Sequence, residues 1–310
     1  MDIIDLRNFD ITPSLLGGTH KKYTVVIDGS EFIIKYPKRN KNGVYDYSVY
    51  SEYIASHILA AMNIDVHEVA FGRTKDGTLV NVIKNFVYGT NLVLKEFGDT
   101  HASSVDSSTV LQNSYSYSDV IAVINAHKNF VSTDSVLYRF WLMFVWDAIL
   151  GNRDRNPSNW GFIQDPVLLQ YTFAPLYDNG GCLFPEFKDF RKEYFSTEAQ
   201  IKYHQVKHAT LYRPASQFHQ DKKNESRSNF YLMLEDLSYS KYLHDIVLTY
   251  RQRLPWQYLA GVCQRIIYST DAPADYKQFM LEIIVLKYRT LILREDFDVV
   301  YSDLINGRLY

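Results

Sequence analysis

Cysteine is scarce in this chain of 310 residues, which contains only Cys182 and Cys263. Two isolated thiols cannot build the disulfide framework of a small secreted protein, and such low usage is typical of a reducing compartment. Cys182 follows a polar motif and is therefore a candidate redox sensor. We nevertheless expect it to pack as a small hydrophobic side chain.

Long hydrophobic runs are absent as well. The most apolar stretch, residues 136–150, is interrupted by Arg139 and Asp147 and is too short to span a bilayer. Residues 1–5 lack the basic segment that opens a signal peptide. These features predict a cytoplasmic protein without membrane contact. Delivery into another cell by a route that needs no signal sequence stays open.

Neither sign of charge is in excess. The net charge is −2 and the isoelectric point is about 6.5, so we expect no direct nucleic-acid partner. The nine histidines show no paired metal-ligand spacing, which argues against a zinc centre. No Gly-x-Ser-x-Gly motif or Cys/His arrangement indicates a hydrolase. Aromatic residues, by contrast, make up 15% of the chain and predict a well-filled core.

The first part of the chain shows the pattern of a small sheet with one helix. Asp28-Gly29 lies between two β-rich runs and is a strong signal for a tight hairpin. Ser51 precedes apolar residues at helical spacing and is the expected N-cap. The expected elements are strands at residues 23–27, 32–35, 66–73 and 78–87 and a helix at residues 51–62. We therefore predict an antiparallel sheet with one helix over residues 1–88.

The rest of the chain is predicted to be mostly helical. Residues 136–150 are apolar nearly all round, which indicates a buried helix. We expect a surface loop at residues 102–118 and irregular structure at residues 185–228. Further expected elements are a strand at residues 171–176 and helices at residues 229–238, 243–253, 256–268 and 274–295. The predicted fold class is α+β, with an N-terminal lobe of residues 1–88 and a helical lobe of residues 89–310.

Two segments in the middle of the chain carry three oxygen-bearing side chains in a specific order. They are residues 151–160, Gly-Asn-Arg-Asp-Arg-Asn-Pro-Ser-Asn-Trp, and residues 174–180, Ala-Pro-Leu-Tyr-Asp-Asn-Gly. An Asp, a nearby Asn and a second Asp after a hairpin form the order of groups that a kinase site needs. Asp154 would accept the proton of the attacking hydroxyl. Asn159 and Asp178 would hold Mg²⁺ on ATP, and Mg²⁺ needs few protein carboxylates.

The first of these segments has two other interpretations. A calcium loop starting at Asp154 would need Gly and Glu at the positions where Asn159 and Asp165 stand. A plain Asn/Asp-rich turn after a helix is common. The buried helix before the segment favours a site, because it delivers its end to a rigid point in the interior. We expect Asp147 on that helix to brace the loop by accepting backbone N–H bonds.

Lys35 and Glu52 form a candidate ion pair beside the nucleotide. A lysine that ends an apolar strand can reach the α- and β-phosphates when a carboxylate fixes its ammonium group. Taken singly, the two residues are also explained as a solvated edge-strand lysine and a glutamate favoured by the helix dipole. Together with the downstream segments, we favour the ion pair.

Further nucleotide contacts are predicted from position. Residues 16–21, Leu-Gly-Gly-Thr-His-Lys, precede the hairpin, and glycines let backbone N–H groups approach a phosphate, although this is no Walker loop. The candidate contacts in this segment are Gly17, Gly18, Thr19 and Lys21. The backbone between Lys84 and Phe86, at the end of a predicted strand, is expected to bond the adenine.

Taken together, these segments resemble the HipA-like serine/threonine kinases, in particular their compact, free-standing bacterial branch. The resemblance covers roughly residues 12–190, and the helical remainder only by its length and character. The segments that carry it are Gly-Gly before the hairpin, Phe-Ile-Ile-Lys-Tyr-Pro at 32–37, Ser-Glu-Tyr-Ile-Ala at 51–55, Trp-Asp-Ala-Ile-Leu-Gly-Asn-Arg-Asp-Arg-Asn at 146–156, Asn-Trp-Gly-Phe at 159–162 and Ala-Pro-Leu-Tyr-Asp-Asn-Gly-Gly-Cys-Leu at 174–183.

The resemblance implies an activity and a set of roles. The chain would transfer the γ-phosphoryl group of ATP, with Mg²⁺ as cofactor, to a Ser or Thr hydroxyl of a protein substrate. Lys35 would bind phosphates and pair with Glu52, and Asp154 would be the catalytic base. Asn159 and Asp178 would bind magnesium. A small antitoxin protein is a further partner that such kinases have, and the oligomeric state is not indicated.

Three details at the site concern the same resemblance. The family usually carries His where this chain has Asn156, which affects the loop geometry but not the metal ligands. The glycine-containing segment is shorter than in the family, which affects the phosphate contacts expected of residues 19–22. In related toxins a serine near this loop is autophosphorylated and disables the enzyme, and Ser14 is the nearest match here.

Two alternative functions stay open. Type II phosphatidylinositol 4-kinases carry a similar Asn-x-Asp-Arg-x-x-x-Asn-Trp and a similar Asp-Asn-Gly, but they add membrane anchors. Here both cysteines are isolated and no basic amphipathic helix is evident. The other alternative is an inactive nucleotide-binding module.

Overall fold

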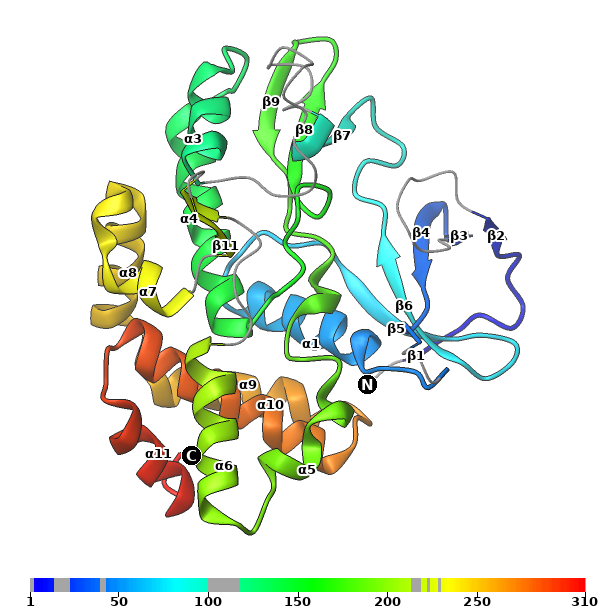
Figure 1. Ribbon diagram of the computed structural model, residues 1–310. Coiled ribbons are helices and arrows are strands. Elements are labelled where there is room, and N and C mark those ends of the chain that lie inside the picture. The colour runs from blue at the N-terminus through cyan, green and yellow to red at the C-terminus, as the bar shows by residue number, and fades with distance from the viewer. Residues whose placement is uncertain are drawn as a thin grey trace.

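The computed structural model describes residues 3–13, 23–39, 43–99, 117–212, 219–221, 224–227 and 230–309 (Figure 1). Its described part contains a six-stranded sheet from the first residues, a three-stranded sheet from the middle of the chain and a body of helices. This α+β architecture agrees with the predicted fold class. The predicted division after residue 88 falls between the two sheets and stays a prediction.

The first sheet is mixed. Its strands are β1 (Ile3–Asp5), β2 (Thr12–Pro13), β3 (Tyr23–Ile27), β4 (Ser30–Lys35), β5 (Val69–Arg73) and β6 (Leu79–Lys84), in the order β1-β5-β6-β4-β3-β2. The predicted hairpin joins β3 to β4, and Asp28 and Gly29 have φ angles of 49° and 78°, as its tight turn requires. The prediction of a wholly antiparallel sheet is wrong, because β1 pairs with β5 in parallel. A three-residue strand carries too little pattern to be recognised from the sequence.

Helix α1 (Ser48–Ala61) connects the first sheet to the helical body (Figure 1). It begins earlier than predicted. Its N-cap residue is Tyr47, whose side chain makes no capping bond, and Oδ1 of Asp46 accepts the backbone N–H of Ser48, the first helical residue, at 3.0 Å. The predicted cap, Ser51, lies inside the helix, and its hydroxyl is 2.9 Å from the hydroxyl of Tyr276. The apolar face of α1 belongs to the large core of the C-terminal helices, whereas the sheet has a small core of its own.

The second sheet is an antiparallel arrangement of β7 (Val93–Glu96), β8 (Gly161–Asp165) and β9 (Gln170–Phe173). The strand predicted at residues 171–176 corresponds to β9, which ends earlier, and β7 was not predicted. After β9, Val66 and Leu176 form a single parallel bridge. That bridge joins the segment before β5 to the segment that leads to Asp178, and it thereby places the second motif beside the first sheet.

Two helices lie between β7 and β8 in the chain, α3 (Tyr117–Ala126) and α4 (Thr133–Leu150). Helix α4 is the predicted buried helix. The hydroxyl of Ser132 caps its start by accepting the N–H of Ser135 at 3.2 Å, and Gly151 ends it with a φ angle of 66°. The first motif therefore starts from a well-defined helix end.

The second half of the chain is more helical than predicted. Its elements are α5 (Arg191–Tyr194), α6 (Ala199–Lys207) with a π-helical continuation at His208–Tyr212, β10 (His219–Asp221), β11 (Asn224–Arg227), α7 (Phe230–Glu235), α8 (Lys241–Arg253), α9 (Trp256–Tyr268), α10 (Ala274–Lys287) with a π-helical turn at Tyr288–Ile292, and α11 (Phe297–Ile305). The four predicted helices correspond to α7 to α10. The prediction of irregular structure at residues 185–228 is wrong for α5, α6, β10 and β11. Helix α6 could not be recognised because it buries only Val206 and so shows little apolar period. Helix α11 was not predicted.

None of the helices in the described residues has the length and apolar character needed to cross a membrane.

Gly161 provides a test of the second sheet. A Cβ atom at this position would lie 2.1 Å from the carbonyl oxygen of Lys95, so Gly161→Ala forces β7 and β8 apart. We expect a loss of about 1–3 kcal/mol in the free energy of unfolding, measured by urea denaturation. Gly98→Ala is the matched control, since its nearest contact would be an ordinary 3.6 Å. Equal stability of the two variants would contradict the described packing.

Candidate active site

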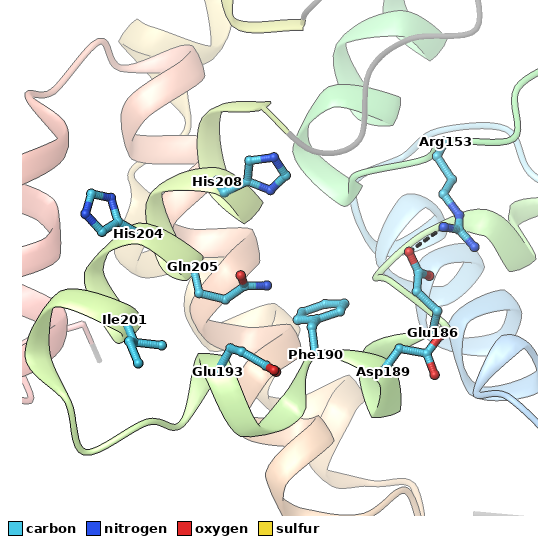
Figure 2. Close-up of a pocket in the computed structure, with 9 residues that line it drawn as sticks. All are labelled: Arg153, Glu186, Asp189, Phe190, Glu193, Ile201, His204, Gln205 and His208. Atoms are coloured by element: carbon cyan, nitrogen blue, oxygen red, sulfur yellow. Dashed lines mark hydrogen bonds and ion pairs between the residues drawn. The ribbon is translucent and has the colours of Figure 1, made fainter.

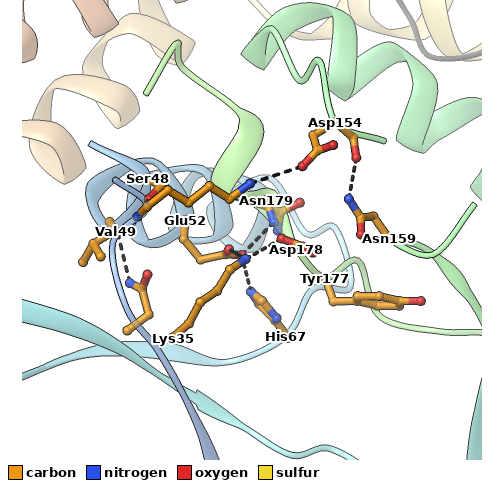
Figure 3. A network of polar contacts seen from close by, with 12 residues as sticks. Lys35, Ser48, Val49, Glu52, His67, Asp154, Asn159, Tyr177, Asp178 and Asn179 are labelled. Atoms are coloured by element: carbon orange, nitrogen blue, oxygen red, sulfur yellow. Dashed lines mark hydrogen bonds and ion pairs between the residues drawn. The ribbon is translucent and has the colours of Figure 1, made fainter. Parts of the chain in front are cut away.

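A lysine, a glutamate and an aspartate from three separate elements form the centre of the site (Figure 3). Lys35 ends β4, Glu52 lies near the start of α1, and Asp178 follows β9. Nζ of Lys35 is 2.6 Å from Oε2 of Glu52 and also contacts Oδ1 of Asp178. The side chain of Glu52 is fully buried, whereas that of Asp178 is 30% exposed. A ligand can therefore reach Asp178 but not Glu52.

The three groups fix each other's charge. Burial alone would raise the pKa of Glu52, but the field of Lys35 and a hydrogen bond with His67 hold that pKa well below its ordinary value. Burial would lower the pKa of Lys35, but the fields of Asp178 and Glu52 raise it instead. Burial also opposes the charge of Asp178, whose pKa is nevertheless lowered by Lys35. All three groups are therefore charged at neutral pH.

The second carboxylate oxygen of Glu52 is held by residues that the sequence analysis missed. Oε1 of Glu52 accepts the backbone N–H of Asn179 at 2.7 Å and lies 3.1 Å from Nε2 of His67. Ser56 bridges the two, 3.1 Å from His67 and 3.0 Å from Nδ2 of Asn179. The one available signal was Ser56, a polar residue one helical turn after Glu52 and hence on the same face. The sequence around His67 gives no such indication.

The loop that carries Asp154 is fastened by side-chain amides. Oδ1 of Asn152 accepts the backbone N–H of Asp154 at 2.9 Å, and Nδ2 of Asn159 donates to the Asp154 carbonyl. Nδ2 of Asn156 is 3.3 Å from Oδ1 of Asp154, so the residue that departs from the resembled family contacts the predicted base. Nζ of Lys38 lies 3.5 Å from the other carboxylate oxygen. Lys38 was not among the predicted site residues.

Arg155 ties the two motif segments together, and the sequence analysis missed it. Its buried guanidinium donates to both carboxylate oxygens of Asp147, at 3.0 and 3.1 Å. It also donates to the carbonyls of Asn159 and Tyr177, each at 2.7 Å, and to Oδ1 of Asn179 at 2.8 Å. Asp147 thus braces the loop, but the predicted backbone N–H bonds are wrong: a carboxylate so deeply buried takes a guanidinium partner instead.

The backbone after β9 approaches the first motif closely. Asp178 has a left-handed φ angle of 56°, and a 3₁₀ turn at Asn179–Gly181 follows it. A Cβ atom at Gly181 would lie 2.7 Å from Cβ of Asp154, and one at Gly180 would lie 3.1 Å from Oε2 of Glu52. Gly181 is needed for this approach, whereas a Cβ atom at Gly180 would require Glu52 to shift by a few tenths of an ångström. The segment with Asp178 therefore packs directly between the Asp154 loop and Glu52.

Asn159 and Asp178 have the donor chemistry that suits Mg²⁺. The amide nitrogen of Asn159 is engaged by the Asp154 carbonyl, which leaves its amide oxygen for a ligand. Lys35 contacts Oδ1 of Asp178, which leaves Oδ2. Among the described residues no group of three His, Cys, Asp or Glu side chains is arranged for a metal. One carboxylate and one amide are enough for Mg²⁺, because this ion keeps water and phosphate oxygens in its shell.

The other predicted nucleotide contacts lie in two segments. Gly17, Gly18, Thr19 and Lys21 lie outside the described residues, as does Ser14, the candidate autophosphorylation site. The backbone N–H of Lys84 donates to the carbonyl of Glu68 at 3.0 Å, and its Nζ pairs with the Glu68 carboxylate at 2.8 Å. The ring of Phe86 lies 6.5 Å from that of Tyr177, close to the second motif. The adenine contacts stay a prediction.

The fold is shared with a known kinase structure. The crystal structure of the proinflammatory kinase CtkA of Helicobacter pylori matches with a TM-score of 0.81 at 23% identity, and the match covers 100% of both chains. A structure of the toxin HipA of Shewanella oneidensis, solved with HipB and operator DNA, covers 96% of this chain and 67% of that chain at 12% identity. Its TM-score of 0.42 is too low to place any residue or partner.

The sequence assigns the family. Residues 14–231 match the family described as HipA-like C-terminal domain, and the chain belongs to that family. The predicted resemblance is thereby confirmed. The serine/threonine-protein kinase CtkA of Helicobacter pylori is 28% identical over 194 residues, which are 61% of this chain and 58% of that relative. The match thus spans less than two thirds of the relative's length.

Arg155 is expected to stabilise the fold as well as the site. Arg155→Met leaves the carboxylate of Asp147 buried without its partner, so we expect a loss of about 3–5 kcal/mol in the free energy of unfolding, measured by urea denaturation. Adding Asp147→Leu should restore part of that loss. Arg7→Met is the control, because Arg7 pairs with Asp5 at the exposed surface. A loss no larger than in the control would contradict the bracing role.

Lys35 should set a pH dependence of stability. Because the pKa of Glu52 is lowered in the folded state, the unfolded chain binds more protons near the ordinary pKa of 4.5, and wild-type stability rises with pH there. In Lys35→Met, burial raises the carboxyl pKa values instead, so stability should fall between about pH 4 and 7.

Urea denaturation at a series of pH values measures this difference between wild type and Lys35→Met. Lys84→Met is the matched control, because the Lys84 and Glu68 side chains are 41% and 74% exposed, so their ion pair is open to solvent. The control should follow the wild-type profile. Parallel profiles for wild type and Lys35→Met would show that Lys35 does not control the buried carboxylates.

Proposed function

We propose that this chain is an ATP-dependent serine/threonine protein kinase of HipA-like type, which transfers the γ-phosphoryl group of MgATP to a hydroxyl of a protein substrate. The observation that carries the proposal is the packing of Asp178 between the Asp154 loop and the Lys35–Glu52 pair. Membership of the HipA-like family supports it. So does the name of the Helicobacter relative, which describes a serine/threonine-protein kinase.

Each side chain has chemistry that suits one part of the reaction. Asn159 and Asp178 would hold Mg²⁺, which neutralises phosphate charge when bound. Lys35, kept charged by Glu52, would hold the α- and β-phosphates. Asp154 would orient the acceptor hydroxyl and take its proton. Rate enhancement would come from positioning and from electrostatic stabilisation of the transferring group.

Nucleotide binding would exchange two contacts. Lys35 would transfer its contact with Asp178 to a phosphate, which frees the carboxylate for the metal. Lys38 would move from Asp154 toward the γ-phosphate. Both exchanges are sterically open, since the Lys38 side chain is 32% exposed and that of Asp178 is 30% exposed. Glu52 would keep its contact with Lys35 throughout, because it is fully buried.

The remaining parts of the proposal rest on the resemblance to the family, on the position of segments in the sequence and, for Mg²⁺, on the donor chemistry of Asn159 and Asp178. They are ATP and Mg²⁺ as the cofactors, phosphate contacts from Gly17, Gly18, Thr19 and Lys21, an adenine contact near Phe86, autophosphorylation at Ser14 and a small antitoxin partner. Each would need its own experiment.

Loss of the base should abolish transfer while nucleotide binding persists. We expect Asp154→Ala to reduce phosphorylation of protein by about 10²–10⁴-fold, as general-base removal does. The assay is incubation with labelled ATP and Mg²⁺, with a fluorescent ATP analogue to follow binding. Asp245→Ala is the matched control, since Asp245 is an exposed residue of α8 whose one described ion-pair contact is with the neighbouring His244.

The same assay separates the alternatives. Label that appears only with phosphoinositide vesicles would overturn the protein kinase in favour of a lipid kinase. ATP binding without transfer to any acceptor would indicate an inactive module. Undiminished transfer by Asp154→Ala would contradict the role of Asp154.

A further inference from the structure

A groove of about 940 Å³ lies beside the loop that carries Asp154 (Figure 2). Arg153, the residue immediately before Asp154, lines one end of it and pairs with the carboxylate of Glu186. The groove is as large as the upper range of ligand pockets, about 300–1,000 Å³. It is separate from the Lys35–Glu52–Asp178 centre, none of whose residues lines it.

Acidic and apolar side chains line the groove together. Asp189, on a 3₁₀ turn at Phe187–Asp189, and Glu193, on α5, are both exposed. Figure 2 shows the Phe190 ring in the middle of the groove, with Ile201 of α6 toward the end away from Arg153. Ile201 is 41% exposed, so an apolar surface is available there.

The charges of the groove are not balanced. The positive charge of Arg153 compensates the negative charge of Glu186, with which it forms an ion pair. Within the described part of the chain, neither Asp189 nor Glu193 has a cation within ion-pair distance. When both histidines are counted as uncharged, Asp189 and Glu193 therefore give the described lining of the groove a net negative charge. Charges of one sign in a concave surface focus the field and attract ligands of opposite sign.

We propose that this groove binds the segment of the protein substrate next to the phosphorylated Ser or Thr and selects segments with Arg or Lys residues. The inference rests on the proposed kinase function, because it uses Asp154 to place the acceptor hydroxyl. Basic side chains of the substrate would reach Asp189 and Glu193. An apolar side chain would lie over Phe190 and Ile201.

Other ligand classes fit the groove less well. Nucleic acids and anionic lipid surfaces would be repelled by the same carboxylates. His204 and His208 lie one helical turn apart at one wall, but no group of three ligating side chains is arranged for a metal in the described residues. A basic peptide satisfies both the negative charge and the apolar surface.

The test compares acceptor peptides that contain one serine and differ only in their flanks: basic, neutral or acidic. We expect the wild type to favour the basic peptide over the acidic one by about tenfold or more in kcat/KM. Asp189→Lys/Glu193→Lys should remove or reverse that preference, while the KM for ATP stays unchanged. Asp245→Lys, which makes the same kind of charge change on α8, should behave like the wild type.

Fluorescence anisotropy with the labelled basic peptide gives a second readout that needs no catalysis. Binding should be lost in Asp189→Lys/Glu193→Lys and weakened in the milder Glu193→Gln. If the peptides bind according to their charge but no phosphoryl group is transferred to any acceptor, the groove proposal is supported and the kinase proposal is contradicted. The groove proposal is contradicted if the wild type and the double variant transfer phosphate with the same flank preference. It is also contradicted if both variants bind the basic peptide as the wild type does. The kinase proposal is unaffected by either result.

Discussion

The buried guanidinium of Arg155 is the interaction on which the candidate site depends. It joins the end of α4, the loop with Asp154 and the segment with Asp178, which come from three different parts of the fold. A guanidinium suits this position, because its fixed fork of donors can serve a carboxylate and several carbonyls at once. Without it the buried carboxylate of Asp147 would lose its ion-pair partner and keep the amide of Asn152, and the two motif segments would lose their common anchor.

A second constraint is the close approach of the Asp178 segment to its neighbours. Gly180 and Gly181 let the backbone pass where any side chain would meet Glu52 or Asp154. The result is a gradient of exposure, from the dry carboxylate of Glu52 to the accessible carboxylate of Asp178. The charge of Glu52 is thereby held in the protein interior, while the charged carboxylate of Asp178 is accessible from solvent. A site that binds phosphates with a divalent cation needs this arrangement.

The sequence predicted those parts of the fold and site that depend on interactions between residues near each other in the chain. The Asp-Gly turn, the apolar run of α4 and the spacing of Asp154 and Asn159 are local patterns of this kind, and each corresponds to a feature of the structure. Arg155 could not be recognised, since its burial depends on tertiary packing against Asp147. Neither β1 nor the start of α1 could be predicted. Three residues give no period, and the N-cap of α1 is Tyr47, whose side chain carries no capping signal. Apart from Arg153, the groove residues come from α5, α6 with its π-helical continuation, and the turns before them, where the apolar pattern is weak.

The central claim is that Asp178 and Asn159 hold one divalent ion under a nucleotide beside Asp154. The most direct measurement is a crystal structure with a non-hydrolysable ATP analogue and Mn²⁺, in which the anomalous signal locates the ion. The account predicts a single strong peak between the carboxylate of Asp178 and the amide oxygen of Asn159, with Lys35 moved onto a phosphate. An ion bound elsewhere, or Asp178 still in contact with Lys35 while the nucleotide is bound, would contradict it.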